Sequence, residues 1–375
     1  MTMTRREFVK SFGGAAALAV LHPELSWASD DVKISDAGAK LYRDSFVFDG
    51  NALASIGSLL EKPDQAEVTK IVRESGITAL KSGLGGATGN FEEAVNEIAV
   101  ADQLMEKRAD LFLKVRVFGD FNRAHKERKL GVIYSFEAVT MLEDKIERIE
   151  MFRHLGVRVM QLTYNRRSPF GIGCLDGETE GLTELGRKAI AKMNEVGIAL
   201  DLSHSNTQTT ADGIAASSKP ALITHAGCRA VHMHPRNKED RELKALAEKG
   251  GVVGIYMLPY LTASPKQPML DDYLQHLEHA VKVCGEDHVG IGSDVPFFRI
   301  GESDLEEMKK TIEKRKADGI AAPGEDRPLY IPDLNTPRKI EFIADALLKR
   351  GHKASTVEKV IGANFKRVFG EIWTT

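Results

Sequence analysis

Eight short apolar runs recur along the chain after residue 45, and longer stretches of helical periodicity separate them. Each run is continuously hydrophobic rather than alternating, which is typical of strands buried on both faces of a parallel sheet. The segment 114–118 is a candidate for one further strand. The pattern predicts strands at 46–49, 77–81, 131–136, 157–163, 198–202, 221–224, 251–257 and 289–291.

Four of the helical stretches stop immediately before a glycine, which is the residue expected just past a helix end. These stretches are 144–155, 183–196, 238–249 and 271–284, followed by Gly156, Gly197, Gly250 and Gly285.

A strand–helix unit repeated eight times predicts a (β/α)8 TIM barrel, an α/β fold. We expect one barrel domain over 29–375, with extra helices and a C-terminal helix. An open doubly wound sheet is the alternative. It is disfavoured because Asp49-Gly50-Asn51-Ala52, after the first strand, is not the glycine-rich phosphate loop of that fold.

The first 28 residues read as an export signal rather than as part of the fold. TRREFVK at 4–10 carries paired arginines, a short apolar stretch follows at 12–21, and Ser26-Trp27-Ala28 offers small residues for cleavage. This pattern is typical of the twin-arginine route. The apolar stretch is shorter than the roughly 20 residues that cross a bilayer, so we expect a periplasmic protein without a stable membrane anchor.

Composition adds little to this picture. The 375 residues are 42% hydrophobic and 28% charged, with a net charge of −3, which is ordinary for a globular protein. The near balance of charge gives no reason to expect a nucleic-acid partner. Cys174, Cys228 and Cys284 lack the spacing of a metal site, and we interpret them as small core or loop residues.

Four predicted strands end in a residue that is costly to bury. Glu137, His204, His225 and Asp294 each directly follow an apolar run. The carboxyl ends of barrel strands meet at one rim, so we expect these side chains to converge. Two imidazoles with carboxylates suit zinc or a similar divalent metal. His232 and His234 are a minor alternative ligand pair, which we interpret as solvated loop residues.

Several longer motifs resemble one known family. They are GVIYSFE, LGVRVMQLTYN, GLTELGRKAIAKMNEVGIALDLSH, ITH, HPRN, VGIGSD and GANFKRVF. Together they make the chain, from about Asp44 to Phe369, similar to the renal (membrane) dipeptidases, zinc peptidases of the amidohydrolase-like superfamily. The resemblance implies a barrel that cleaves the amide bond of dipeptides or similar small amides with a zinc-activated water. It also implies two zinc ions per chain and often a homodimer.

The resemblance assigns roles to individual residues. Glu137 matches the glutamate that bridges two zinc ions, and His204 and His225 match the histidines of one zinc site. Asp294 matches the aspartate that holds the other zinc and handles the proton of the attacking water. Arg236 matches the arginine that binds the terminal carboxylate of the substrate, a task suited to its bidentate fork.

Two departures from the family motif bear on the mechanism. The first strand of the family ends in D-G-H-x-D, whose His and Asp bind metal, whereas here Asn51 and Leu53 stand at those positions. Tyr164 stands where the family commonly has a histidine that polarises the scissile carbonyl, and its hydroxyl can still donate a hydrogen bond.

We therefore expect one zinc ion per chain, held by Glu137, His204 and His225, with Asp294 free to act as general base and acid. Two alternatives remain. The ligand loss suggests a catalytically silent barrel that binds a small molecule or peptide. The barrel also suits hydrolysis of a lactone, an ester or a cyclic amide. We expect the loops at 83–90, 258–268 and 297–332 to shape the pocket, but their composition does not identify a substrate. The charge-rich segment at 302–319 is expected to be an exposed helix.

Overall fold

A computed structural model describes residues 33–52 and 65–373. The export signal predicted at 1–28 and Leu53 lie outside the described residues. In the described part, eight parallel strands follow one another in the order β1-β2-β4-β5-β6-β7-β9-β10, while β3 and β8 pair with β4 and β7. The strands are β1 Phe48–Asp49, β2 Ala79–Leu84, β3 Phe112–Lys114, β4 Leu130–Phe136, β5 Val157–Gln161, β6 Ala199–Asp201, β7 Leu222–Cys228, β8 Asn237–Lys238, β9 Val252–Ile255 and β10 Val289–Ile291.

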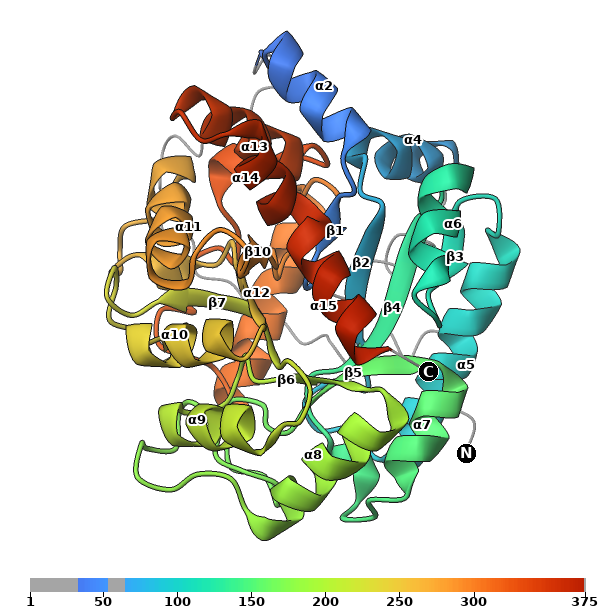
Figure 1. The fold of residues 1–375 in the computed structure, drawn as a ribbon, viewed down its shortest axis with the longest axis vertical. Helices are drawn as coiled ribbons and strands as arrows, with labels where there is room; N and C mark the ends of the chain where they lie inside the picture. Colours follow the sequence, from blue (N-terminus) through green and yellow to red (C-terminus); the bar gives the residue numbers. More distant parts are fainter. Residues whose placement is uncertain (1–32, 53–64, 374–375) are drawn as a thin grey trace.

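The first and last strands meet, which makes the sheet a barrel (Figure 1). The backbone N–H of Gly50, just after β1, donates to the carbonyl oxygen of Ile291 in β10 at 2.8 Å. The predicted (β/α)8 barrel is confirmed, and the doubly wound alternative is wrong because that sheet has open edges. All eight predicted strands are present. The further strand expected at 114–118 lies slightly earlier, as β3, which pairs with the amino half of β4 beside β5.

Helices surround the barrel, and the four glycine-ended helices are present as predicted. Gly156 and Gly197 follow α7 and α8 with φ of 106° and 73°, a left-handed conformation that glycine adopts without steric cost. The helices are α2 Asp36–Asp44, α4 Gln65–Ser75, α5 Phe91–Lys107, α6 Gly119–Glu127, α7 Arg148–Leu155, α8 Glu184–Val196, α9 Thr207–Ala216, α10 Asp240–Glu248, α11 Leu270–Cys284, α12 Glu302–Ala317, α13 Lys339–Lys349, α14 Ala354–Glu358 and α15 Asn364–Ile372.

The amino end of the barrel interior is filled by apolar side chains. Seven of the eight barrel strands contribute one buried residue each, β10 being the exception, and Phe365 and Phe369 of the C-terminal helix α15 pack on Phe48 at this end. Helix α15 crosses the barrel there (Figure 1). Burial of such side chains stabilises the fold by about 1.5–3 kcal/mol each. The strand residues of this apolar layer are Phe48, Ala79, Ile133, Val159, Ala199, Leu222 and Val252.

Two residues further along the strands, where side chains again face the interior, the layer is polar. Lys81, Ser135, Gln161, Asp201 and Thr224 are all buried there. The Lys81 ammonium lies 3.3 Å from Ser135 Oγ and 3.9 Å from Asp201 Oδ2, so β2, β4 and β6 are joined by polar contacts across the interior. This polar layer lies toward the carboxyl ends of the strands.

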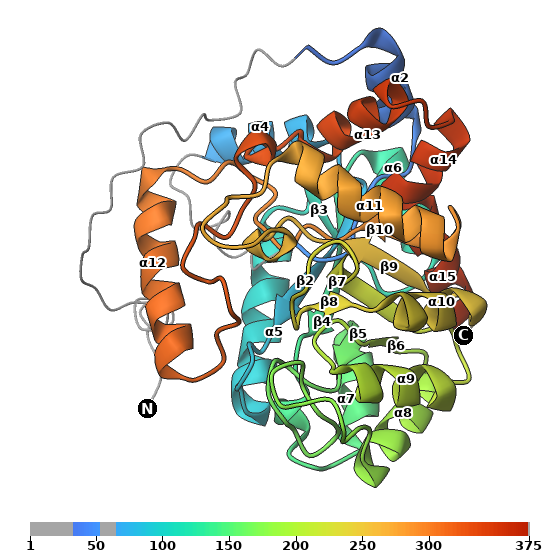
Figure 2. The ribbon, with the colours of Figure 1, turned by 90° about the vertical axis from the view of Figure 1, so that its left-hand side faces the viewer.

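Helix α12 stands apart at one side of the barrel (Figure 2). It confirms the helix expected in the charge-rich segment 302–319. Within the described residues, no helix combines the length and apolar character needed to cross a membrane.

Candidate metal centre

Four strand ends predicted to carry a metal site come together at the barrel rim. Glu137 follows β4, His225 lies in β7 and Asp294 follows β10, and one possible ligand atom from each lies within 4.8 Å of the others. His204 follows β6, and its Nε2 lies 2.9 Å from Nε2 of His225. Their convergence follows from the fold, because the carboxyl ends of all eight strands open at this rim.

The hydrogen bonds of His225 fix which of its ring nitrogens carries the proton. Thr224 Oγ1 lies 2.9 Å from His225 Nδ1 and donates its own proton to Asp201 Oδ2 at 2.5 Å. Since the Thr224 hydroxyl has one proton, it must accept from Nδ1–H of His225. The Nε2 atom of His225 therefore turns a lone pair into the site.

His204 has the same arrangement. Its Nδ1 lies 2.7 Å from Asn165 Oδ1, while the Asn165 amide nitrogen donates to the carbonyl of Ile320 at 2.8 Å. An amide oxygen only accepts, so Nδ1 of His204 carries the proton and Nε2 carries the lone pair. Partners of this kind orient histidine ligands in metal sites.

Two nitrogen lone pairs thus face each other at 2.9 Å. Burial and the nearby Arg236 guanidinium hold the pKa of both His204 and His225 well below the usual range, so neither ring supplies a second proton. Arg236 Nη2 lies 3.1 Å from His204 Nε2 and can donate to it, whereas a cation between the two rings would engage both lone pairs. The donor set therefore fits a divalent metal ion that prefers nitrogen and carboxylate ligands.

Asp294 is held in an unfavourable environment for a charged group. Burial, and then the nearby Glu137 carboxylate, raise its pKa to about 8. Its backbone has a φ of 56°, and its N–H donates to the Asn51 carbonyl at 2.7 Å. Non-glycine residues in this region cost about 1–3 kcal/mol and are frequent at functional sites.

Asn51, which replaces a metal ligand of the family motif, cross-links the two carboxylates. Its Nδ2 donates to Glu137 Oε1 at 2.9 Å and to Asp294 Oδ1 at 2.7 Å. Its Oδ1 is buried and has no hydrogen-bond partner among the described residues. Gly83 gives the Glu137 carboxylate room, because a Cβ at this position would lie 3.1 Å from Glu137 Oε1. The amide thus joins the carboxylates of β4 and β10 without adding charge.

Lys81 is a charged member of this site that sequence reasoning missed. Its side chain is fully buried in β2, with Nζ 3.9 Å from Glu137 Oε1. The available signal was a lysine inside the apolar run ITALK. A lysine in such a run is rarely buried unless a carboxylate faces it.

Arg236 is not a surface arginine, since its side chain is 1% exposed. Its Nη2 lies 3.1 Å from His204 Nε2 and 3.5 Å from the His225 carbonyl oxygen, and its Nη1 donates to the Ser203 carbonyl. The guanidinium therefore lies beside the histidine pair and directs its fork at this part of the rim.

The Tyr164 ring stacks on the His204 ring, with the ring centroids 4.2 Å apart. Its hydroxyl oxygen accepts a hydrogen bond from Arg315 Nη1 at 2.6 Å, and burial raises the pKa of Tyr164 to about 12. Arg315 is held by two 2.7 Å hydrogen bonds to Glu325, which also accepts from the Tyr260 hydroxyl. Arg315 lies in the last turn of α12, so this helix is more than a solvated surface element.

The alternative pair His232 and His234 does not form a second metal site. His234 stacks on Tyr260 at 4.5 Å, donates from Nε2 to the Pro323 carbonyl and accepts at Nδ1 from the Arg236 backbone N–H. Both of its nitrogens are engaged. The interpretation of His234 as a solvated loop residue was wrong, because it is 7% exposed.

The three cysteines are free thiols, and Cys174 and Cys228 are buried, which agrees with their interpretation as small core or loop residues. The Cys174 thiol contributes to the site indirectly, because it donates to Asn165 Oδ1, which also orients His204, at 3.4 Å.

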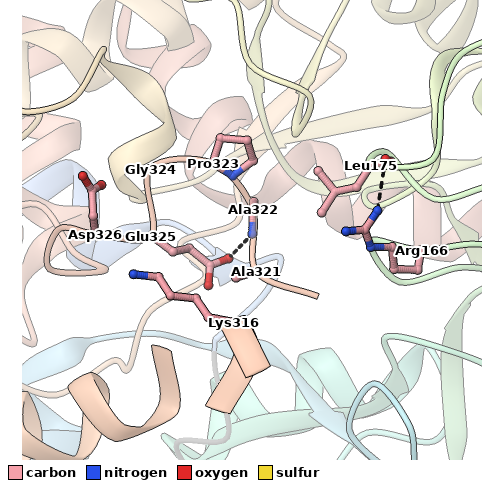
Figure 3. Close-up of a pocket in the computed structure, with 9 residues that line it drawn as sticks. All are labelled: Arg166, Leu175, Lys316, Ala321, Ala322, Pro323, Gly324, Glu325 and Asp326. Atoms are coloured by element: carbon pink, nitrogen blue, oxygen red, sulfur yellow. Dashed lines mark hydrogen bonds between the residues drawn. The ribbon is translucent and has the colours of Figure 1, made fainter. Parts of the chain in front are cut away.

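A cavity of about 460 Å³ lies beside residues 321–326, in the segment that follows α12 (Figure 3). Arg166 and Lys316 bring positive charge to its wall, and the Glu325 carboxylate accepts from the Ala322 N–H there. Arg166 and Leu175 directly follow Asn165 and Cys174, which connects this wall to the support of His204. The volume falls in the range of small-molecule sites.

Comparison with known proteins identifies the family. The model of the membrane dipeptidases, peptidase family M19, matches residues 62–318. The chain belongs to this family. The match covers the strand ends that carry Glu137, His204, His225 and Asp294.

Individual members of the membrane dipeptidase family differ substantially in sequence from this chain. Dipeptidase tcpJ of Claviceps purpurea is 24% identical over 290 residues, which are 76% of this chain and 60% of that protein. An uncharacterized dipeptidase of Schizosaccharomyces pombe is 29% identical over 51% of this chain and 47% of its own length. The chain thus spans about half to three-fifths of these relatives.

A solved amidohydrolase structure from Pseudomonas aeruginosa superposes with a TM-score of 0.78 at 31% identity, covering 90% of this chain and 99% of that one. A metallo peptidase from Rhodobacter sphaeroides superposes with a TM-score of 0.70 at 21% identity, covering 88% of this chain and all of that one. The second likeness supports the barrel fold.

Proposed function

We propose that this protein is a zinc-dependent hydrolase that cleaves the amide bond of dipeptides or similar small amides. The observation that carries the proposal is the pair of opposed Nε2 lone pairs on His204 and His225, with two carboxylates beside them. Family membership supports the reaction class. The Rhodobacter metallo peptidase, solved with a phosphinate mimic of the dipeptide L-Ala-D-Ala, supports a dipeptide-like substrate.

His204, His225 and Glu137 would hold the metal ion, with Asp294 beside them. A bound zinc ion supplies Lewis acidity and lowers the pKa of a bound water to about 7. Asn51 lacks the donor strength of the missing imidazole, and Leu53 offers no ligand atom in place of the aspartate, so one ion per chain is expected rather than two.

Asp294 is the proton-transfer group in this proposal. One of its carboxylate oxygens lies within 4.8 Å of possible ligand atoms of Glu137 and His225, which is close enough to take a proton from a water held between them. Asp294 takes the proton of the attacking water and gives it to the departing amine. Asn51 and the left-handed backbone hold its carboxylate in place.

Arg236 and Tyr164 position the substrate. The Arg236 fork suits the terminal carboxylate of a dipeptide. Because Arg315 donates to the Tyr164 oxygen, the Tyr164 proton is free to donate to the scissile carbonyl as negative charge develops there. Arg315 thus acts as a positioning residue from α12.

The direct test is hydrolysis of a dipeptide panel by the metal-free protein and after addition of zinc. We expect turnover only with zinc, and Asp294→Asn should reduce kcat about 100-fold or more while zinc still binds. Lactone and ester substrates assayed in parallel distinguish the other reaction class. Dipeptide binding without turnover in the zinc-loaded parent would instead support a catalytically silent barrel.

The N-terminal twin-arginine pattern supports a periplasmic location for this activity. Replacing Arg5 and Arg6 by lysine should retain the protein in the cytoplasm. Fractionation that still finds the variant in the periplasm would contradict this assignment.

A further inference from the structure

Lys81 is the buried charge that the proposed reaction leaves without a role. It lies in β2, two residues beyond Ala79 of the apolar layer, and its side chain is 0% exposed. Its ammonium lies 3.9 Å from Glu137 Oε1 and 3.9 Å from Asp201 Oδ2, carboxylates that belong to two other strands. Ser135 Oγ, at 3.3 Å, accepts its hydrogen bond.

The two buried cationic side chains of the site, Arg236 and Lys81, face different groups. Arg236 contacts His204 and the carbonyl groups near it, whereas Lys81 faces Glu137 and Asp201. Asn51 also contacts Glu137, but its amide is neutral. Among the described residues, Lys81 therefore supplies the ion pair of Glu137.

The position of Lys81 affects how much positive charge the site can accept from metal ions. Glu137, Asp201 and Asp294 carry up to three negative charges in a water-poor interior, where uncompensated charge is costly. Lys81 compensates one of these charges on the side of Glu137 and Asp201, as Arg236 does on the side of the histidines, so little negative charge remains for a second divalent ion. A second divalent ion would be repelled by the ammonium at short range.

We propose that Lys81 is a built-in cation of the metal centre, which compensates Glu137 and Asp201 and limits the site to one divalent metal ion. The inference rests on the proposed metal-dependent function and adds a positioning residue to it. It gives the Glu137 carboxylate a positively charged neighbour in a barrel that has Asn51 in place of a histidine.

Binding of Zn²⁺ alone to the purified full-length chain tests the proposal. Titration calorimetry gives the Kd, elemental analysis gives the number of ions per chain, and thermal unfolding gives the stability of the metal-free protein. For Lys81→Met we expect a lower Tm without metal and a Kd for Zn²⁺ lowered about ten-fold or more, because the repulsion is gone while the carboxylates remain.

Lys238→Met is the matched control. Lys238 is also buried, and its ammonium lies 3.7 Å from Glu242 and contacts Ser205 and Thr210 rather than the metal-site carboxylates. This variant should lower Tm as well, and it should change the Kd for Zn²⁺ clearly less than Lys81→Met does, because the Lys238 charge reaches the histidines but faces neither Glu137 nor Asp201. Lys81→Gln, which is neutral but keeps a polar group on the side of Ser135, replaces Lys81→Met if the latter does not fold.

An unchanged Zn²⁺ affinity in the neutral Lys81 variant, or an equal change in the Lys238 control, would reduce Lys81 to a structural lysine. Failure of the proposed function looks different. A parent protein that binds one Zn²⁺ but hydrolyses no substrate loses its assigned reaction, whereas the comparison of the two lysines still decides the role of Lys81.

Discussion

The two layers of the barrel interior are built from the same strands and differ only by two positions along them. Ala79 lies below Lys81, Ile133 below Ser135 and Ala199 below Asp201. The lower layer is apolar and closed by α15, whereas the upper layer is charged and supports the metal centre. The strands therefore place the polar and charged side chains one pleat repeat beyond a packed apolar layer. The apolar layer contributes mainly to stability, and the polar layer supports the proposed chemistry.

The largest effect on activity is expected from a change at the carboxyl end of the strands, above the apolar layer. His225→Ala removes one of the two opposed Nε2 atoms, so we expect zinc binding to be lost and kcat/KM to fall by about 1,000-fold or more. Elemental analysis and dipeptide assays measure both quantities.

His276→Gln is the control for this variant. His276 is equally buried, but its nitrogens contact the Cys228 N–H and the Leu261 carbonyl away from the metal centre. This control should cost stability while zinc binding persists. Retained zinc and turnover in His225→Ala would place the chemistry elsewhere.

The converse change breaks the lower layer. Ile133→Ala leaves a cavity among Phe48, Ala79 and Val159, and should reduce the free energy of unfolding by about 2–5 kcal/mol. The kcat/KM of the folded protein should change little, because Glu137 lies two pleat repeats beyond Ile133 along β4. Urea unfolding and assays at low temperature test the two halves of this statement. A loss of zinc affinity in Ile133→Ala would show that the layers are coupled.

This separation also explains what the sequence could predict. The strands were predictable because both of their faces are buried and their hydrophobicity is continuous, as in GVIYSF of β4. The convergence of the strand-end side chains was predictable because Glu137, His204, His225 and Asp294 interrupt such runs at the carboxyl end. The fold and this cluster thus follow from local pattern.

The supporting residues could not be predicted in this way. Arg315 meets Tyr164 across 151 residues of sequence, and Asn165 orients His204 from the loop after β5. Their roles arise from tertiary contacts that leave no periodic signal. The predicted solvated character of His234 failed for the same reason, since its burial depends on Tyr260 from another loop.

The upper layer should also make stability depend on pH in the metal-free protein. Asp294 has an ordinary pKa of 3.8 when unfolded and about 8 when folded, so between these values the folded state binds more protons. The free energy of unfolding should therefore fall as pH rises from about 4 to about 8, by up to about 1.4 kcal/mol per pH unit.

Asp294→Asn should flatten this dependence, because the amide does not titrate. Urea unfolding at a series of pH values in the presence of a chelator provides the measurement. An equal slope in the parent and the Asn variant would contradict the assignment of the raised pKa to Asp294.

The smallest expected effect tests how much of the upper layer is needed at all. Gln161 lies two residues beyond Val159, is 1% exposed, and both of its amide atoms lack hydrogen-bond partners among the described residues. A buried amide without partners costs about 1–3 kcal/mol, and an apolar side chain of similar shape avoids this cost. Gln161→Leu should therefore raise the free energy of unfolding by about 1 kcal/mol.

The informative result for Gln161→Leu is whether the free energy of unfolding rises or falls. Stabilisation with unchanged zinc affinity and kcat/KM would mean that the apolar layer can extend upward on β5 without touching the metal centre. Destabilisation by more than about 1 kcal/mol would instead mean that the amide is solvated and belongs with Lys81 and Asp201 as a working part of the polar layer. Urea unfolding of the parent and the variant, with and without zinc, separates the two outcomes.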